Sequence, residues 1–134
     1  MGPGVFSERD LSIDADLRWL HRAREWAARA AQEFGFEEEG CYQVKLAMSE
    51  AVANAIQHGS QSAEDSVQIS ARESDGALVF EVRDTGSYVA PEAPATEMSE
   101  RGRGLALVGI VMDEVQLEPG QDGSLLRFAK RLGG

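Results

Sequence analysis

Three polar residues recur at one spacing in the first half of the sequence. Glu50, Asn54 and His58 lie four residues apart, within a stretch whose apolar residues have a helical period. At about 100° per residue they share one stripe of a helix, at the edge of its apolar face. Mg²⁺ takes oxygen ligands, usually few of them from protein, so this stripe suits a magnesium site with a positioned base. The solvated edge of an amphipathic helix has the same pattern, and both interpretations stay open here.

A second candidate group follows a strand-like run of apolar residues. In Asp84-Thr85-Gly86, a carboxylate at a strand end can accept a hydrogen bond from an exocyclic amine such as that of adenine. Gly86 would let a flat ring approach the backbone, because glycine has no side chain in the way. Asp-x-Gly is also ordinary turn chemistry, so these residues alone do not distinguish a nucleobase site from a turn.

Two arginines and two glycines stand together further along the chain. Arg101-Gly102-Arg103-Gly104-Leu105 comes at the end of an irregular stretch and the start of an expected helix. Free N–H groups at a helix N-terminus favour phosphate, and the arginines add charged donors. A loop hinge before a helix would also have this composition. No Gly-Lys-Ser/Thr follows, as a P-loop requires, and no strand–turn–helix unit at the chain start supports a dinucleotide fold.

The elements that must position these groups follow from periodicity and from turn residues. Asp14 is expected to cap the first helix, Gly35 and Gly59 to end the first and the second, and Asp75-Gly76 to form a tight hairpin turn. The expected elements are a strand within 5–13, helices 14–34 and 37–58, a loop 60–66, strands 67–71 and 78–82, a loop 85–103, a helix 104–112, and a hairpin of 115–117 with 125–130 around 119–123.

This order of elements predicts an α+β fold, a two-layer α/β sandwich. Helices are expected to cover one face of a mixed, mainly antiparallel sheet. The apolar stripe of the second helix consists of Val44, Met48, Ala51 and Ala55. Trp19 and Trp26 are expected in the core or at a dimer contact. The loop 85–103 is long enough to predict a functional lid or a disordered segment.

Bulk properties narrow the class of protein. The 134 residues predict one domain, 1–134, with a loose end at 1–4. The net charge of −10 disfavours nucleic-acid binding, because an acidic surface repels phosphates. The single cysteine, Cys41, cannot form an internal disulfide. No apolar run long enough for a membrane span and no signal peptide is found, which predicts a cytoplasmic protein.

Together and in this order, the three groups resemble the GHKL ATPase superfamily, and within it the bacterial anti-sigma factor serine/threonine kinases. Lys45–Gly59 (KLAMSEAVANAIQHG) is similar to the N-box and Val82–Gly86 (VRDTG) to the G1 box. Gly102–Val108, followed by Met112–Val115, is similar to the G2 box and its helix, and Gly123-Ser124 stands where the family usually has Gly-Thr. The resemblance extends from Leu11 to Leu132 and implies the Bergerat ATP-binding fold.

The resemblance implies a role for each motif residue. Glu50 matches the general base that takes the proton from the substrate serine, Asn54 the magnesium ligand, and Asp84 the carboxylate that reads adenine. Further nucleotide contacts are implied for His58, Gly86, Arg101, Gly102, Arg103, Gly104, Leu105 and Ser124. The family also implies ATP or ADP and Mg²⁺ as cofactors, a sigma factor and a STAS-type anti-sigma factor antagonist as partners, and a homodimer.

The chain departs from the family pattern at three positions. Tyr88 stands where many members of the superfamily have a second G1 glycine, which the stress-type anti-sigma kinases tolerate. Arg103 replaces an apolar residue often found between the lid glycines. Both changes are expected to alter nucleotide exchange rather than abolish binding. Ser124 in place of threonine keeps the hydroxyl group.

Two other functions stay open. One is a non-catalytic ATP-binding or anti-sigma module, although the intact Glu50 and Asn54 favour retained catalysis. The other is the catalytic domain of a histidine kinase. It is disfavoured because the stretch between Gly86 and Gly102 is short and no separate pair of phosphoacceptor helices precedes the domain. His21 is expected to be a surface histidine of the first helix.

Overall fold

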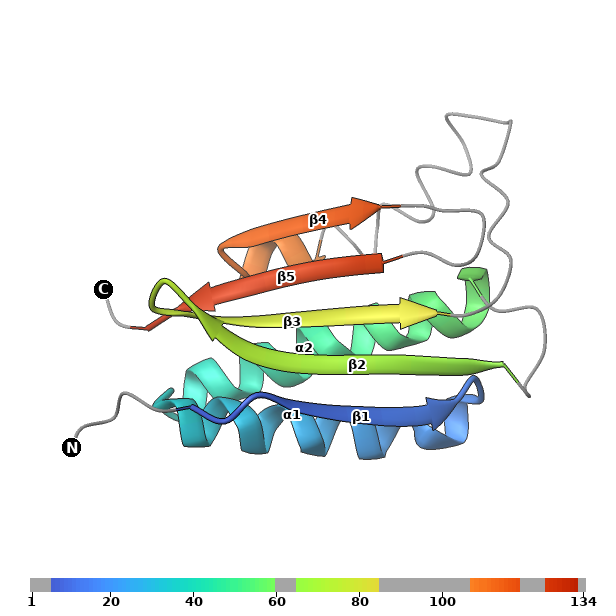
Figure 1. The fold of residues 1–134 in the computed structure, drawn as a ribbon, viewed down its shortest axis with the longest axis horizontal. Coiled ribbons are helices and arrows are strands. Elements are labelled where there is room, and N and C mark those ends of the chain that lie inside the picture. The colour runs from blue at the N-terminus through green and yellow to red at the C-terminus, as the bar shows by residue number, and fades with distance from the viewer. Residues whose placement is uncertain (1–5, 60–64, 85–106, 119–124, 133–134) are drawn as a thin grey trace.

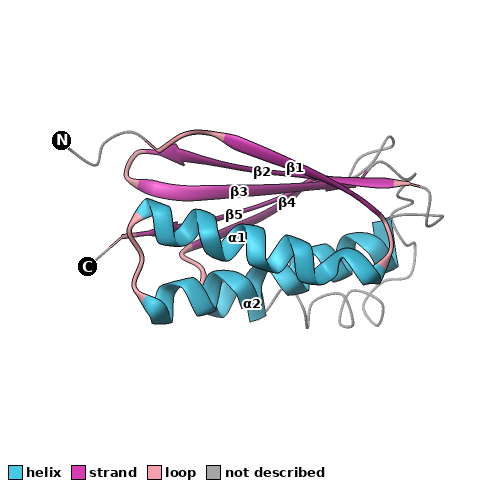
Figure 2. Cartoon of the chain, turned by 90° about the horizontal axis from the view of Figure 1, so that it is seen from below, coloured by secondary structure: helices cyan, strands magenta, loops and turns pink. Residues whose placement is uncertain are grey.

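The computed structural model describes residues 6–59, 65–84, 107–118 and 125–132. Within them a five-stranded sheet has the order β1-β2-β3-β5-β4, and two long helices cover one of its faces (Figures 1 and 2). All four strand pairings are antiparallel, where the sequence predicted a mixed, mainly antiparallel sheet. The elements are β1 (Arg9–Asp14), α1 (Leu20–Phe34), α2 (Glu38–Asn54), β2 (Ser66–Ser74), β3 (Ala77–Asp84), β4 (Glu114–Glu118) and β5 (Leu125–Arg131).

The core lies between the sheet and the helices, and every second residue of the central strands points into it. Ile69, Phe80 and Phe128 are at most 1% exposed, and the two phenylalanine rings stack with centroids 5.4 Å apart. The helix α1 contributes only alanines to its fully buried face, which lets it pack closely. Trp19 and Trp26 are half-buried against this core, which confirms the core interpretation for both.

The first helix ends where the sequence predicted, but its cap is a different residue. Asp14 was expected to be its cap, but it is the last residue of β1, where pairing with Ser66 keeps it extended. Asp16 is the cap instead: its Oδ1 accepts from the Arg18 N–H at 3.0 Å, at the start of a 3₁₀ turn, Leu17–Trp19, that precedes α1. Gly35 ends α1 as predicted, with a φ of 122° that favours glycine.

The hairpin between β2 and β3 sets where Asp84 lies. Asp75 and Gly76 have φ values of 53° and 80°, as the predicted tight turn requires. From this turn β2 and β3 pair without interruption until Val67 lies opposite Asp84. Asp84 therefore lies at the end of the sheet furthest from the hairpin turn (Figure 1).

The second helix runs slightly further than its α-helical part. After Asn54 the chain continues as a π-helical turn, Ala55–Gly59, which packs against β3. The predicted end at Gly59 is therefore confirmed, but the last turn is wider than an α-helical one. Residues 107–111 form a helical turn within the predicted helix 104–112, with Val108 and the following Met112 buried in the core. No described helix is long and apolar enough to cross a membrane.

Candidate active site

Among the described residues, Asp84 is the one charged side chain that is buried, with 1% of its surface exposed. Because side chains alternate along a strand, it shares the helix-facing side of β3 with Phe80 and Val82, while Glu81 and Arg83 lie on the other side. Placing a carboxylate there is costly unless polar groups compensate it. A buried carboxylate at the end of a strand is therefore a candidate functional residue.

The helix α2 brings Glu50 and Asn54 to the same end of the molecule. Its buried stripe contains Met48, Ala51 and Val52, and both polar residues are half-buried at the border of that stripe. The C-terminal end of α2 lies beside the C-terminal end of β3, which Asp84 closes (Figure 1). The predicted helix stripe and the predicted strand-end carboxylate therefore meet at one end of the domain.

The π-helical turn Ala55–Gly59 is a feature of this end that periodicity did not predict. Such turns are rare and frequently occur at functional sites. The backbone of His58 belongs to this turn, and its side chain lies outside the described residues. The turn packs directly against β3, so it joins the α2 stripe to the strand that carries Asp84.

The other predicted site residues fall on segments that the structure does not describe. These are Gly86, Arg101, Gly102, Arg103, Gly104, Leu105 and Ser124. Two described segments nonetheless start close behind them in the sequence, the helical turn 107–111 two residues after Leu105 and β5 directly after Ser124. The structure thus brings the segments that carry Glu50, Asn54 and Asp84 to one end of the domain. The roles assigned to these three and to the remaining residues all stay predictions.

The oxygen donors at this end fit a magnesium–nucleotide complex. The described residues contain no group of three or more His, Cys, Asp or Glu side chains placed to hold a metal ion. Mg²⁺ that is held mainly by substrate phosphates and water needs only one or two protein oxygens. The Asn54 amide oxygen can provide one, and the Glu50 carboxylate one helical turn away stays available as a base.

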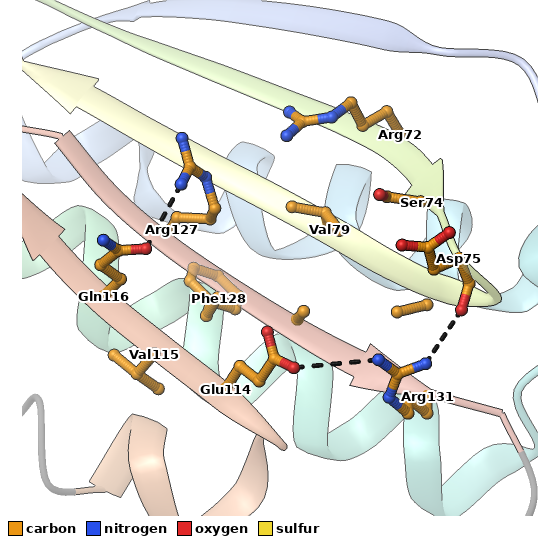
Figure 3. A pocket seen from close by; sticks show the side chains of 12 residues that line it. Arg72, Ser74, Asp75, Val79, Glu114, Val115, Gln116, Arg127, Phe128 and Arg131 are labelled. Carbon is orange, nitrogen blue, oxygen red and sulfur yellow. Dashed lines mark hydrogen bonds and ion pairs between the residues drawn. The ribbon is translucent and has the colours of Figure 1, made fainter.

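The helix-free face of the sheet carries a second feature, which the sequence reading missed. A hollow of 490 Å³ lies over Ala77, Val79 and Ala129, with Arg72, Arg127 and Arg131 along its sides (Figure 3). Glu81 Oε2 accepts from Arg127 Nε at 2.8 Å and lies 3.2 Å from Arg72 Nη1. Opposite charges on neighbouring strands were the available signal, with Arg127 directly opposite Glu81 and Arg72 diagonal to it.

Two effects oppose one another at the Glu81 carboxyl. Burial alone would raise its pKa, but the hydrogen bond from Arg127 and the charge of Arg72 outweigh burial, and its pKa is lowered. The carboxylate therefore stays ionised and keeps both arginines in place across β2, β3 and β5. We call the helix-free side of these three strands together with β4 the open face.

Comparison with known proteins agrees with this geometry. Residues 13–130 match the Histidine kinase-like ATPase domain family. A serine-protein kinase RsbW of Oceanobacillus iheyensis is 27% identical in an alignment that covers 90% of this chain and 84% of that protein. A serine-protein kinase RsbW of Bacillus licheniformis is 30% identical in an alignment that covers 75% of this chain and 72% of that protein.

Solved structures share the fold at lower identity. The crystal structure of the RsbU and RsbW domains of a Mycobacterium tuberculosis protein superposes with a TM-score of 0.73 and 20% identity. The match covers 93% of this chain, which spans 32% of that longer one. The Acinetobacter baumannii histidine kinase AdeS gives a TM-score of 0.55 at 12% identity over 94% of this chain and 68% of its own. The α+β sandwich is confirmed by both.

Proposed function

Since the chain belongs to the Histidine kinase-like ATPase domain family and has relatives named serine-protein kinase RsbW over most of its length, we propose that it is an ATP-dependent serine/threonine protein kinase that acts as an anti-sigma factor. The observation that carries the proposal is the meeting of Asp84 with the α2 stripe at one end of the domain. Asp84 accepts a hydrogen bond from the adenine amine, and Asn54 and Glu50 act beside the phosphates.

The chemistry is phosphoryl transfer, in which positioning and charge neutralisation do most of the work. Glu50 takes the proton of a serine hydroxyl on the partner protein. The serine oxygen forms a bond to the γ-phosphorus, the bond from that phosphorus to the β–γ bridging oxygen breaks, and ADP leaves. Mg²⁺, held in part by Asn54, would neutralise charge on the phosphates. Gly102, Gly104 and the two arginines beside them are proposed to contact those phosphates, and Ser124 to support the adenine.

The proposed partners are proteins. One is a sigma factor, which this chain keeps from RNA polymerase, and the other is a STAS-type antagonist that carries the serine. We place this activity in the cytoplasm, where ATP and the transcription machinery are found. Nucleic acid is not a proposed partner, because a chain with a net charge of −10 repels phosphate backbones.

A phosphorylation assay tests the proposal directly. The chain is incubated with Mg²⁺, γ-labelled ATP and each STAS-type protein encoded beside a sigma factor in the same genome. We expect label on a serine of one such protein, and the same labelling with His21→Ala, since His21 is an exposed residue of α1. ATP binding without transfer to any of them would favour the non-catalytic module. Acid-labile phosphate on His21 would favour the histidine kinase.

We also propose that two copies of the chain meet through the open face. Two chains of net charge −10 repel each other, so a homodimer needs a face on which opposite charges can pair. Arg127 and Glu118, and Arg131 and Glu114, stand 3.9 Å and 3.8 Å apart there and are accessible for exchange with a second copy. The apolar floor of the hollow offers a surface to bury between them.

The homodimer is tested by adding a charge to this floor. Val79 is 6% exposed and central in the hollow, so Val79→Glu places a longer, charged side chain in the apolar floor of the proposed contact. Light scattering after gel filtration is expected to give twice the 14.5 kDa of one chain for the wild type and the mass of one chain for the variant. Tyr42→Glu, at an exposed position of α2, is the matched control and should remain dimeric. A monomeric wild type, or a dimeric Val79→Glu, contradicts the assignment.

A further inference from the structure

Lys130 is a cation on the core-facing side of the sheet. It follows Phe128 at the next position of β5 that points towards the helices, where the pattern of the strand would predict an apolar residue. Its side chain is half-buried, and its ammonium group lies 6.0 Å from the centroid of the Phe36 ring. A lysine in such a position has given up part of its hydration, so what it contacts is informative.

The ammonium of Lys130 donates to the carbonyl oxygen of Val111 at 3.3 Å. Val111 ends the helical turn 107–111, and carbonyl groups at a helix C-terminus have no partner within the helix. A cation there both satisfies a carbonyl and complements the negative end of the helix dipole. Lys130 therefore fixes the end of this turn to the last strand.

Asp113, two residues after Val111, is held on the same strand by two further hydrogen bonds. The Asp113 N–H donates to the Ala129 carbonyl at 2.9 Å, and Asp113 Oδ2 accepts from the Arg131 N–H at 2.7 Å. We call residues 111–113 the helix–strand junction. Three consecutive residues of β5, Ala129 to Arg131, thus hold the junction through backbone and side-chain groups together.

We infer that Lys130 is a positioning residue for nucleotide binding. The inference rests on the proposed function, in which Gly102 and Gly104 contact the phosphates. The helical turn 107–111 begins three residues after Gly104 in the sequence, and Lys130 and Asp113 determine where the turn ends against the sheet. Lys130 therefore sets nucleotide affinity from the end of the sheet opposite Asp84, without touching the nucleotide.

Calorimetric titration with Mg-ATP separates this role from a purely structural one. Lys130→Met keeps the length of the side chain but removes the donor, and we expect the Kd to rise about fivefold to twentyfold with the stoichiometry unchanged. A merely structural defect would lower the stoichiometry and leave the Kd of the folded fraction as it was. Lys130→Arg, which keeps a charged donor, should restore most of the affinity.

Arg9→Met is the matched control, because Arg9 is a half-buried cation of edge strand β1 that pairs with Glu33 of α1, far from the junction. It should bind Mg-ATP as the wild type does. Should Lys130→Met fail to fold, Asp113→Asn tests the same junction with the same expected rise. If these junction variants bind Mg-ATP with the Kd of the wild type, the inference is overturned and the proposed function is not. A wild type that binds no nucleotide overturns the proposed function and the inference with it.

Discussion

Asp84→Asn is expected to weaken binding of both ATP and ADP by about 30- to 150-fold. A hydrogen bond to a buried charged group is worth about 2 to 3 kcal/mol, and each 1.4 kcal/mol is tenfold in affinity. Asparagine has nearly the same size, so the packing around position 84 is kept. Its amide is neutral, however, so a hydrogen bond that its oxygen accepts from the adenine amine is weaker than one to a carboxylate, and its NH₂ group cannot accept one. Titration calorimetry with Mg-ATP and with ADP measures the loss.

The control for this variant is Asp75→Asn on the same hairpin. Asp75 lies at the opposite end of β3, is exposed, and has a φ of 53° that asparagine also tolerates. It should bind nucleotide as the wild type does. Thermal denaturation of both variants, measured alongside, separates a loss of the ligand contact from a loss of folded protein. Equal affinity of Asp84→Asn and the wild type would reject the adenine role.

The parts of the fold that local chemistry dictates could be predicted from the sequence. Helical and alternating periods identified α1, α2 and the strands, and Gly35 and Asp75-Gly76 marked where the chain had to adopt a positive φ. The buried stripe of Val44, Met48, Ala51 and Ala55 was confirmed because an amphipathic helix has only one face to bury.

The parts that depend on tertiary pairing could not be predicted in the same way. Asp14 has the composition of a helix cap, but its place opposite Ser66 in the sheet decides its conformation, and the capping role passes to Asp16. The π-helical turn after Asn54 has no signature in the hydrophobic pattern. Lys130 interrupts the apolar alternation of β5 because of a contact with Val111, nineteen residues away.

The same division applies to the candidate site. Residue types and order indicated Glu50, Asn54 and Asp84 through a family resemblance, and the structure places the segments carrying all three at one end of the domain. Their convergence follows from the antiparallel pairing of β2 with β3 and from packing of Ala55–Gly59 on β3. Neither is encoded by any single motif, so spacing alone left the helix stripe and the turn as open interpretations.

Glu50→Ala is expected to keep nucleotide binding and to lose phosphoryl transfer by about 10²- to 10⁴-fold, the usual contribution of a positioned general base. Glu50 lies one helical turn before Asn54 at the border of the buried stripe of α2. Removing its carboxylate leaves Asp84 and Asn54 in place, so the adenine and magnesium contacts of the proposal persist. Initial rates of serine phosphorylation, measured at saturating Mg-ATP, report the loss.

Glu50→Gln sharpens this test, because glutamine keeps the shape and the oxygen of the side chain but cannot accept the serine proton. If Glu50 acts as the base, the glutamine and alanine variants lose transfer to a similar extent while their Kd values for Mg-ATP stay close to that of the wild type. If Glu50 instead holds Mg²⁺, the glutamine oxygen rescues part of the rate and the alanine variant binds Mg-ATP more weakly. Glu39→Ala, in the exposed first turn of the same helix, should leave both quantities unchanged.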